Sequence, residues 1–128
     1  MGTGCLWMEG SMKKIQRKIL LNILGIDGIT LWPNIYVNDV NDYRIVNHEL
    51  IHICQIKSLI DSHGKTKGVW LFYWRYVKHL IIKGGYRKIP FEIEARKYQR
   101  DSRFLETIYS QYWDELKGFL PEKDRLIN

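Results

Sequence analysis

The sequence is poor in cysteine and proline, and it contains no long uncharged hydrophobic run. Its 128 residues include three prolines and only two cysteines, Cys5 and Cys54, with no C-x-x-C pair. A disulfide-dense scaffold is therefore excluded, and nothing calls for an oxidising compartment. The most apolar segment, residues 69–83, includes Arg75 and Lys78. It is too short and too charged to span a bilayer.

Acidic residues are also few relative to basic ones. The chain has 14 Asp and Glu against 20 Lys and Arg, a net charge of +6 and a pI of about 9.3. This balance suits an anionic partner such as nucleic acid or an acidic lipid surface, or simply a solvated basic surface. No nucleic-acid-binding motif accompanies the charge, so nucleic acid is not the expected partner. A content of 45% hydrophobic and 27% charged residues is typical of a globular protein.

The start of the chain shows little pattern, and we expect residues 1–12 to be a dispensable extension before a single domain over residues 13–128. A methionine followed by two lysines at positions 12–14 resembles a second start. The basic and then apolar order that follows imitates a signal peptide, but the apolar part is short and no small-residue cleavage site follows it. A short amphipathic helix ending at Gly25 or Gly28 is the better interpretation, and a cytoplasmic location is expected.

The most specific motif of the chain lies in residues 47–55, which read Asn-His-Glu-Leu-Ile-His-Ile-Cys-Gln and contain H-E-x-x-H. Side chains four positions apart lie on the same side of a helix, so His48 and His52 can present two imidazoles to one zinc ion. Glu49 can lie beside a metal-activated water and accept its proton. Gln55 falls about 20° from His48 around the helix axis, on the same side.

Two histidines satisfied inside a buried helix are the structural alternative to a metal site. The apolar residues between Ile45 and Ile60 spread around nearly the whole circumference, which predicts a buried helix. Histidines and a glutamate in such a helix need partners, because unpaired polar groups are costly in the interior. One metal ion would partner both histidines at once, so we favour the metal.

The segments around this motif predict a mostly helical α+β domain. Residues 28–37 are rich in β-branched and aromatic residues, and Pro33 indicates an edge strand or a break into two short strands. An exposed edge can bind an extended peptide by strand addition. Asn41 or Asp42 can cap the motif helix, which should run over residues 43–62.

Residues 69–83 predict another helix, for which two interpretations stay open. A core helix that covers the motif helix is favoured, because a small chain needs its aromatic residues for burial. The alternative is an interfacial helix, with aromatic residues at the lipid boundary and basic residues toward the headgroups. Peripheral membrane contact through residues 69–83 is therefore an expectation to be tested.

A second acidic motif begins at Pro90, which favours the start of a helix. We expect this helix to continue to about Phe119, with Pro121 marking its end. Glu92 and Glu94 lie in its first turn, where carboxylates suit the helix dipole even without any metal.

The two motifs together resemble the gluzincin side of the zincin metallopeptidases, in which a glutamate in a pattern like E-x-x-A follows H-E-x-x-H. Here Glu92 to Ala95 matches that pattern, although Arg96 stands where an aspartate often follows. The string from Thr30 to Ala95 also resembles a family of small uncharacterised bacterial proteins, and the resemblance covers residues 28–100. It implies a minimal zincin-like domain with a short edge strand or hairpin and about three main helices.

The resemblance further implies a zinc ion held by His48, His52 and a glutamate. Glu92 and Glu94 are about 200° apart on a helix, so they cannot both face one ion. The E-x-x-A pattern favours Glu92. Glu94 stays open as the alternative third ligand, because it shares a face with Leu105, Ile108 and Tyr112 if the helix is straight.

Three functions from different classes fit the sequence. The first is a zinc-dependent peptidase in which Glu49 is the general base and a peptide or protein is the substrate; Tyr86 is a candidate donor to the oxyanion. The second is an inactive metal-binding module of the same fold, which the small size favours. The third is a basic protein of a membrane surface or of nucleic acid, in which the motif is structural.

Overall fold

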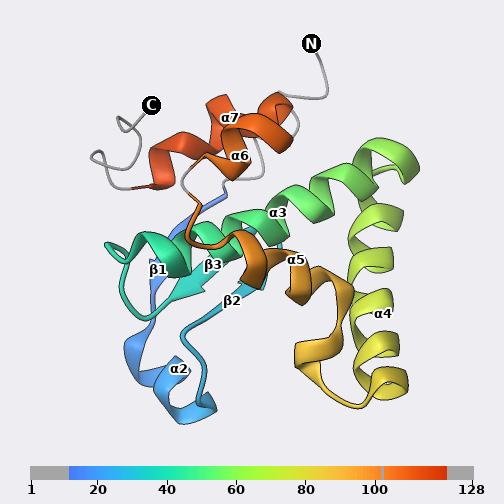
Figure 1. Ribbon diagram of the computed structural model, residues 1–128, viewed down its shortest axis with the longest axis horizontal. Coiled ribbons are helices and arrows are strands. Elements are labelled where there is room, and N and C mark those ends of the chain that lie inside the picture. Colours follow the sequence, from blue (N-terminus) through green and yellow to red (C-terminus); the bar gives the residue numbers. More distant parts are fainter. Residues whose placement is uncertain (1–11, 102, 121–128) are drawn as a thin grey trace.

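The computed structural model describes residues 12–101 and 103–120, and it has the mostly helical α+β architecture that the sequence predicts. Its central element is helix α3 (Tyr43–His63), which contacts the sheet and the neighbouring helices α4 and α5. Figure 1 shows α3 across the middle of the molecule, with α2 and β2 on one side and α6 and α7 on the other. Because α3 carries the H-E-x-x-H motif, the whole fold is arranged around the candidate site.

Three short strands form one sheet in the order β1 (Lys14–Gln16), β3 (Asn34–Val37), β2 (Gly28–Leu31). β1 runs parallel to β3, and β2 pairs antiparallel with β3. The connection between β2 and β3 consists of Trp32 and Pro33, joined by a cis peptide bond. Pro33 therefore divides the extended segment into two strands and leaves β2 at an edge of the sheet, as predicted.

The ends of α2 and α3 follow from their local sequences. Helix α2 (Lys18–Leu24) ends at Gly25, whose φ of 74° lies in the left-handed region that glycine adopts at little cost. Asp42 caps α3 by accepting a 3.0 Å hydrogen bond from the backbone N–H of Arg44. Twelve residues of α3 are buried, which confirms the prediction of a buried helix.

Helix α4 (Lys65–Lys83) packs against α3 with one face only. Gly68 lies so close to α3 that a Cβ atom there would be 2.5 Å from the Cα of Ile60. Phe72 is buried and stacks on Phe91, but Trp70 is 61% exposed. The predicted core helix is therefore correct for the inner face and wrong for the outer face, over which the described residues place no other element.

The predicted single helix from Pro90 to Phe119 is wrong. After a 3₁₀ turn, η1 (Tyr86–Lys88), the chain forms α5 (Pro90–Tyr98), α6 (Phe104–Ile108), α7 (Ser110–Leu116) and a second 3₁₀ turn, η2 (Lys117–Phe119). The side-chain amide of Asn47 donates to the backbone carbonyls of Tyr98, Gln99 and Asp101, which holds the break after α5. The break allows the residues of α6 and α7 to join the core beside α3.

Some sequence predictions fall outside the described residues. Residues 1–11, including Cys5, are among these, so the dispensable extension stays a prediction; Met12 itself packs against the main core. Cys54 is a buried free thiol, as expected for a cysteine inside α3. Within residues 12–101 and 103–120, no helix has the length and apolar character needed to cross a membrane.

Candidate metal centre

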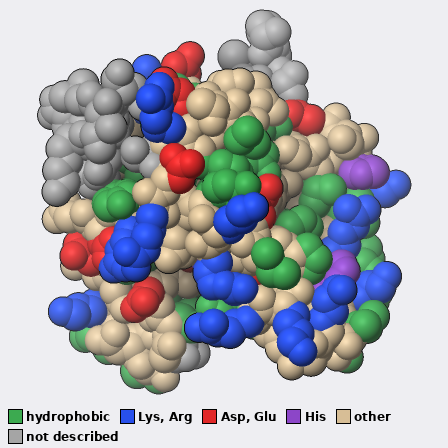
Figure 2. All heavy atoms as spheres, in the orientation of Figure 1, with side chains coloured by type: hydrophobic (Ala, Val, Ile, Leu, Met, Phe, Trp, Pro, Cys, Tyr) green, Lys and Arg blue, Asp and Glu red, His purple; other side chains and the backbone are tan. Residues whose placement is uncertain are grey.

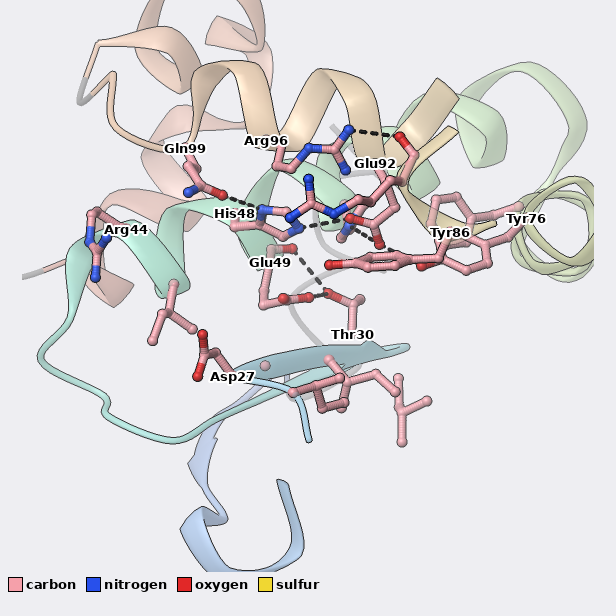
Figure 3. A pocket seen from close by; sticks show the side chains of 18 of the residues that line it. Asp27, Thr30, Arg44, His48, Glu49, Tyr76, Tyr86, Glu92, Arg96 and Gln99 are labelled. Atoms are coloured by element: carbon pink, nitrogen blue, oxygen red, sulfur yellow. Dashed lines mark hydrogen bonds and ion pairs between the residues drawn. The ribbon is translucent and has the colours of Figure 1, made fainter. Parts of the chain in front are cut away.

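Three side chains from two helices converge on one point. His48 and His52 come from successive turns of α3, and Glu92 comes from the first turn of α5. The Nε2 atom of His48 lies 3.0 Å from Glu92 Oε1, and the Nε2 atom of His52 lies 3.2 Å from Glu92 Oε2. One atom from each residue lies within 4.8 Å of the other two, so the three can hold a metal ion. Figure 3 shows His48 and Glu92 pointing toward one another.

Two glutamines decide which ring nitrogen of each histidine is available. The Nδ1 atom of His48 lies 2.8 Å from Gln99 Oε1, and that of His52 lies 2.7 Å from Gln55 Oε1. Gln55 Nε2 donates to Phe91 O and to a carboxylate, so Gln55 Oε1 must be an acceptor. The His52 Nδ1 atom is therefore the protonated one in the neutral ring, and its Nε2 lone pair faces the centre.

This arrangement fits a cation better than it fits the protein groups alone. His52 is only 3% exposed, and its Nε2 atom makes no hydrogen bond within the described part of the chain, although Glu92 Oε2 lies 3.2 Å away. A lone pair and a carboxylate oxygen repel each other unless a proton or a metal ion lies between them. Two imidazoles and one carboxylate are a donor set that zinc accepts in catalytic sites.

The local field also favours a positive charge. Burial lowers the pKa of His52, but its close contact with the Glu92 carboxylate and the charge of Glu49 outweigh that effect and raise the pKa overall. Burial raises the pKa of Glu92, yet its contacts with His48 and His52 hold the pKa far below the ordinary value. Two carboxylates beside two imidazoles therefore stabilise a cation at this point, whether a proton or a metal ion.

Glu49 lies beside the converging ligands and is held by the edge strand. It is 5% exposed, and its Oε1 atom accepts a 2.7 Å hydrogen bond from the Thr30 hydroxyl. Gly28 leaves the room for this side chain, because a Cβ atom there would be 3.0 Å from Glu49 Oε2. The pKa of Glu49 is raised overall, because the effect of burial is larger than the opposing effects of His52, His48 and Thr30. A carboxylate with a raised pKa is a better proton acceptor near neutral pH.

Glu94, the alternative third ligand, is outside the metal cluster. Its Oε1 atom accepts hydrogen bonds from Gln55 Nε2 at 2.8 Å and from the Tyr109 hydroxyl at 2.9 Å. Glu94 therefore orients His52 indirectly, through its hydrogen bond with Gln55, and does not itself reach the centre. The expected separation of about 200° between Glu92 and Glu94 explains why only Glu92 reaches the histidines.

Sequence reasoning missed two partners of the cluster. The Tyr76 hydroxyl of α4 donates to Glu92 Oε2, a contact between distant segments that no local pattern marks. Gln99 holds His48, and here a signal existed: Gln99 follows Glu92 by seven positions, or about two turns on the same side of the helix. Arg96 donates to the backbone carbonyl of Arg87 and does not take the place of the expected aspartate.

The centre opens into a pocket of about 760 Å³. β2 forms one wall, and aromatic side chains of α4 form another, namely Phe72, Tyr73 and Tyr76. Tyr86 also lines the pocket and is 50% exposed. Figure 3 shows Arg44, Arg96 and Tyr86 around this space, with Glu49 and Thr30 between the histidine and the strand. The ligands therefore face a cavity large enough for part of a peptide.

Comparisons of the chain with protein-family models, with curated proteins and with solved structures each found no match.

Proposed function

We propose that this protein is a zinc-dependent peptidase, with His48, His52 and Glu92 as ligands and Glu49 as the general base. The observation that carries the proposal is the convergence of two imidazole Nε2 atoms on one carboxylate, with an outer glutamine at each Nδ1 atom. A purely structural pair of histidines requires neither the carboxylate of Glu92 between the rings nor a second glutamate, Glu49, at the same opening.

In this proposal each residue of the site has a separate role in hydrolysis. Bound zinc supplies Lewis-acid chemistry, which lowers the pKa of water toward neutrality and polarises a carbonyl group. Glu49 accepts the proton of the attacking water and passes it to the leaving amine. Thr30 keeps the Glu49 carboxylate directed at the pocket. The Tyr76 hydroxyl holds Glu92, and burial raises the pKa of Tyr76, so this group stays a neutral donor.

The edge strand supports a peptide as the substrate. Ile35 and Val37 of β3 direct their backbone groups toward β1, since Ile35 N donates to Lys13 O and Val37 O accepts from Arg17 N. Thr30 and Gly28 lie opposite these two residues, so their own backbone groups face the outer edge of β2, where the Thr30 carbonyl also accepts a 2.9 Å hydrogen bond from the Tyr73 hydroxyl. Both residues line the pocket. An extended peptide added at this edge would run past Glu49 and the metal ligands.

Metal analysis tests the first half of the proposal. The purified chain should contain about one zinc per molecule. His48→Ala should lose it, whereas His63→Ala should keep it, because His63 is exposed at the far end of α3. Equal zinc content in both variants would refute the metal site.

Hydrolysis of a fluorescence-quenched peptide library by the zinc-loaded chain tests the second half. Glu49→Gln should keep zinc and lose about 10²–10⁴-fold in rate, the usual contribution of a general base. Asp114→Asn is the matched control, since it also removes one negative charge but lies at an exposed position. Zinc binding without hydrolysis by the unaltered chain would refute the peptidase and leave the second candidate, a metal-binding module.

A further inference from the structure

The outer face of α4 is apolar and open, and the proposed peptidase reaction does not use it. This face consists of Trp70, Trp74, Val77 and Ile81, which follow one another at helical spacing along one side of α4. Trp74 is 51% exposed and Ile81 is 74% exposed. The rings of Trp70 and Trp74 stack on each other with centroids 5.7 Å apart. Two adjacent exposed tryptophans on one helix face are unusual for a surface that contacts only water.

Two exposed lysines flank this face, because Lys67 lies three positions before Trp70 and Lys78 four positions after Trp74. Between Asp61 and Glu92 the sequence contains no acidic residue but seven exposed basic ones, namely Lys65, Lys67, Arg75, Lys78, Lys83, Arg87 and Lys88. Figure 2 shows Lys and Arg side chains (blue) among hydrophobic ones (green) on the side of the molecule where α4 lies. The face is therefore both apolar and positively charged.

We propose that the outer face of α4 docks onto an anionic lipid surface. A helix that lies in the membrane interface has this pattern: tryptophan and aliphatic side chains enter the boundary of the acyl region, and lysines and arginines contact the headgroups. Each basic residue near an anionic bilayer adds to the attraction, so Lys67 and Lys78 beside this face favour acidic lipids over neutral ones. The whole folded chain would bind as a peripheral protein.

Two other occupants fit the face less well. A second copy of the chain would bring Lys67 and Lys78 close to the same two lysines of the other copy, and this repulsion opposes a symmetric dimer. Nucleic acid would match the charge and could stack on the tryptophans. It offers nothing apolar for Val77 and Ile81, which are 46% and 74% exposed.

Docking in this way leaves the candidate metal centre accessible. Phe72 and Tyr76 line the pocket, and Trp74 lies about 200° from Phe72 around the axis of α4. The lipid-facing side and the pocket-facing side are thus opposite sides of one helix. Because no step of the docking involves the metal ligands, the inference stands or falls separately from the proposed peptidase.

Co-sedimentation of the full chain with vesicles tests the proposal. The protein should pellet with vesicles of phosphatidylcholine containing phosphatidylserine, and it should stay in the supernatant with phosphatidylcholine alone. Added salt should weaken the binding, because the attraction to the headgroups is screened. Failure to bind phosphatidylserine vesicles at low salt would overturn the proposal.

Two pairs of variants locate the binding surface. Ile81→Ser on α4 should weaken vesicle binding, whereas Ile108→Ser, which alters a 58% exposed isoleucine of α6, should not. Lys67→Gln with Lys78→Gln should lower the affinity by more than about tenfold, and Lys13→Gln with Lys97→Gln, which removes the same charge elsewhere, should change it little. Equal losses within either pair would mean that the outer face of α4 is not the surface involved.

The tryptophans separate lipid from the other occupants. Trp70→Ala with Trp74→Ala should abolish vesicle binding while the circular dichroism spectrum stays that of the folded chain, since both side chains are exposed. Sedimentation velocity should show the same oligomeric state for the unaltered chain and for this double variant, because the two tryptophans do not form a dimer interface. Binding to single-stranded nucleic acid that depends on the two tryptophans, without vesicle binding, would overturn the lipid proposal in favour of nucleic acid.

Discussion

Helices α3 and α4 are consecutive, similar in length and similarly rich in apolar residues, yet α3 is largely buried and α4 is largely exposed. Twelve residues of α3 are buried, and five of these have polar or charged side chains, whereas only Gly68 and Phe72 are buried in α4. The polar side chains of α3 can be buried because each has a partner: Asn47 on carbonyl groups, Gln55 on Glu94, Glu49 on Thr30. Burial here follows from neighbours and not from hydrophobicity alone.

The largest expected difference between the two helices concerns metal binding. Loss of a residue that hydrogen-bonds to a metal ligand lowers metal affinity by roughly 10–100-fold. His52→Ala on α3 removes a ligand itself, so it should lower zinc affinity by more than that. His79→Ala on α4 should leave the affinity unchanged, since His79 contacts the Arg75 carbonyl of its own helix. Zinc titration against a competing chelator measures both. A comparable loss in His79→Ala would contradict the assignment of the centre to α3.

The two faces of α4 should differ in their contribution to stability. Phe72→Ala should lower the free energy of unfolding by about 3–5 kcal/mol, because it leaves a cavity beside Phe91 and the His52 ring. Trp70→Ala should change it by no more than about 0.5 kcal/mol, as for other exposed side chains. Urea denaturation followed by circular dichroism decides between them. A large loss in Trp70→Ala would show that the outer face is covered in the folded protein.

The contact between the two helices should depend on a glycine. Gly68→Ala places a Cβ atom 2.5 Å from the Ile60 backbone, so the helices must separate, at a cost of about 1–3 kcal/mol in the free energy of unfolding. Gly118→Ala is the matched control, because a Cβ atom there meets nothing within 4 Å. The same denaturation experiment applies, and equal stability of the two variants would mean that the close approach of α3 and α4 is absent in solution.

The smallest of these effects should come from Glu94, which supports α3 without facing the centre. Glu94→Gln keeps its size but weakens its hold on Gln55, so zinc affinity should fall by about 10-fold. Glu92→Gln should cost much more, because it removes the carboxylate between the two histidines. Calorimetric zinc titration of both variants makes the comparison. A larger loss of zinc affinity in Glu94→Gln than in Glu92→Gln would mean that Glu94, and not Glu92, is the third ligand.

Local chemistry explains which structural features could be predicted. The capping of α3 by Asp42, the end of α2 at Gly25 and the division of the extended segment at Pro33 each depend on a few neighbouring residues. The continuous helix after Pro90 was wrong because its end depends on Asn47, a residue of another helix that competes for the carbonyl groups around Gln99. The local signal for the break is Asp101, whose side chain accepts a 2.9 Å hydrogen bond from the backbone N–H of Arg103.

The sequence by itself determined the most local part of the candidate centre. The four-residue spacing of His48 and His52 places both imidazoles on one side of a helix, because helical geometry depends only on separation along the chain. Only the tertiary structure decided what else surrounds them: Glu92 opposite the two rings, Tyr76 on Glu92, and Gln99 behind His48. It alone also decided that one side of α4 is covered and the other open. These contacts join residues far apart in the chain, and their formation depends on how the helices pack.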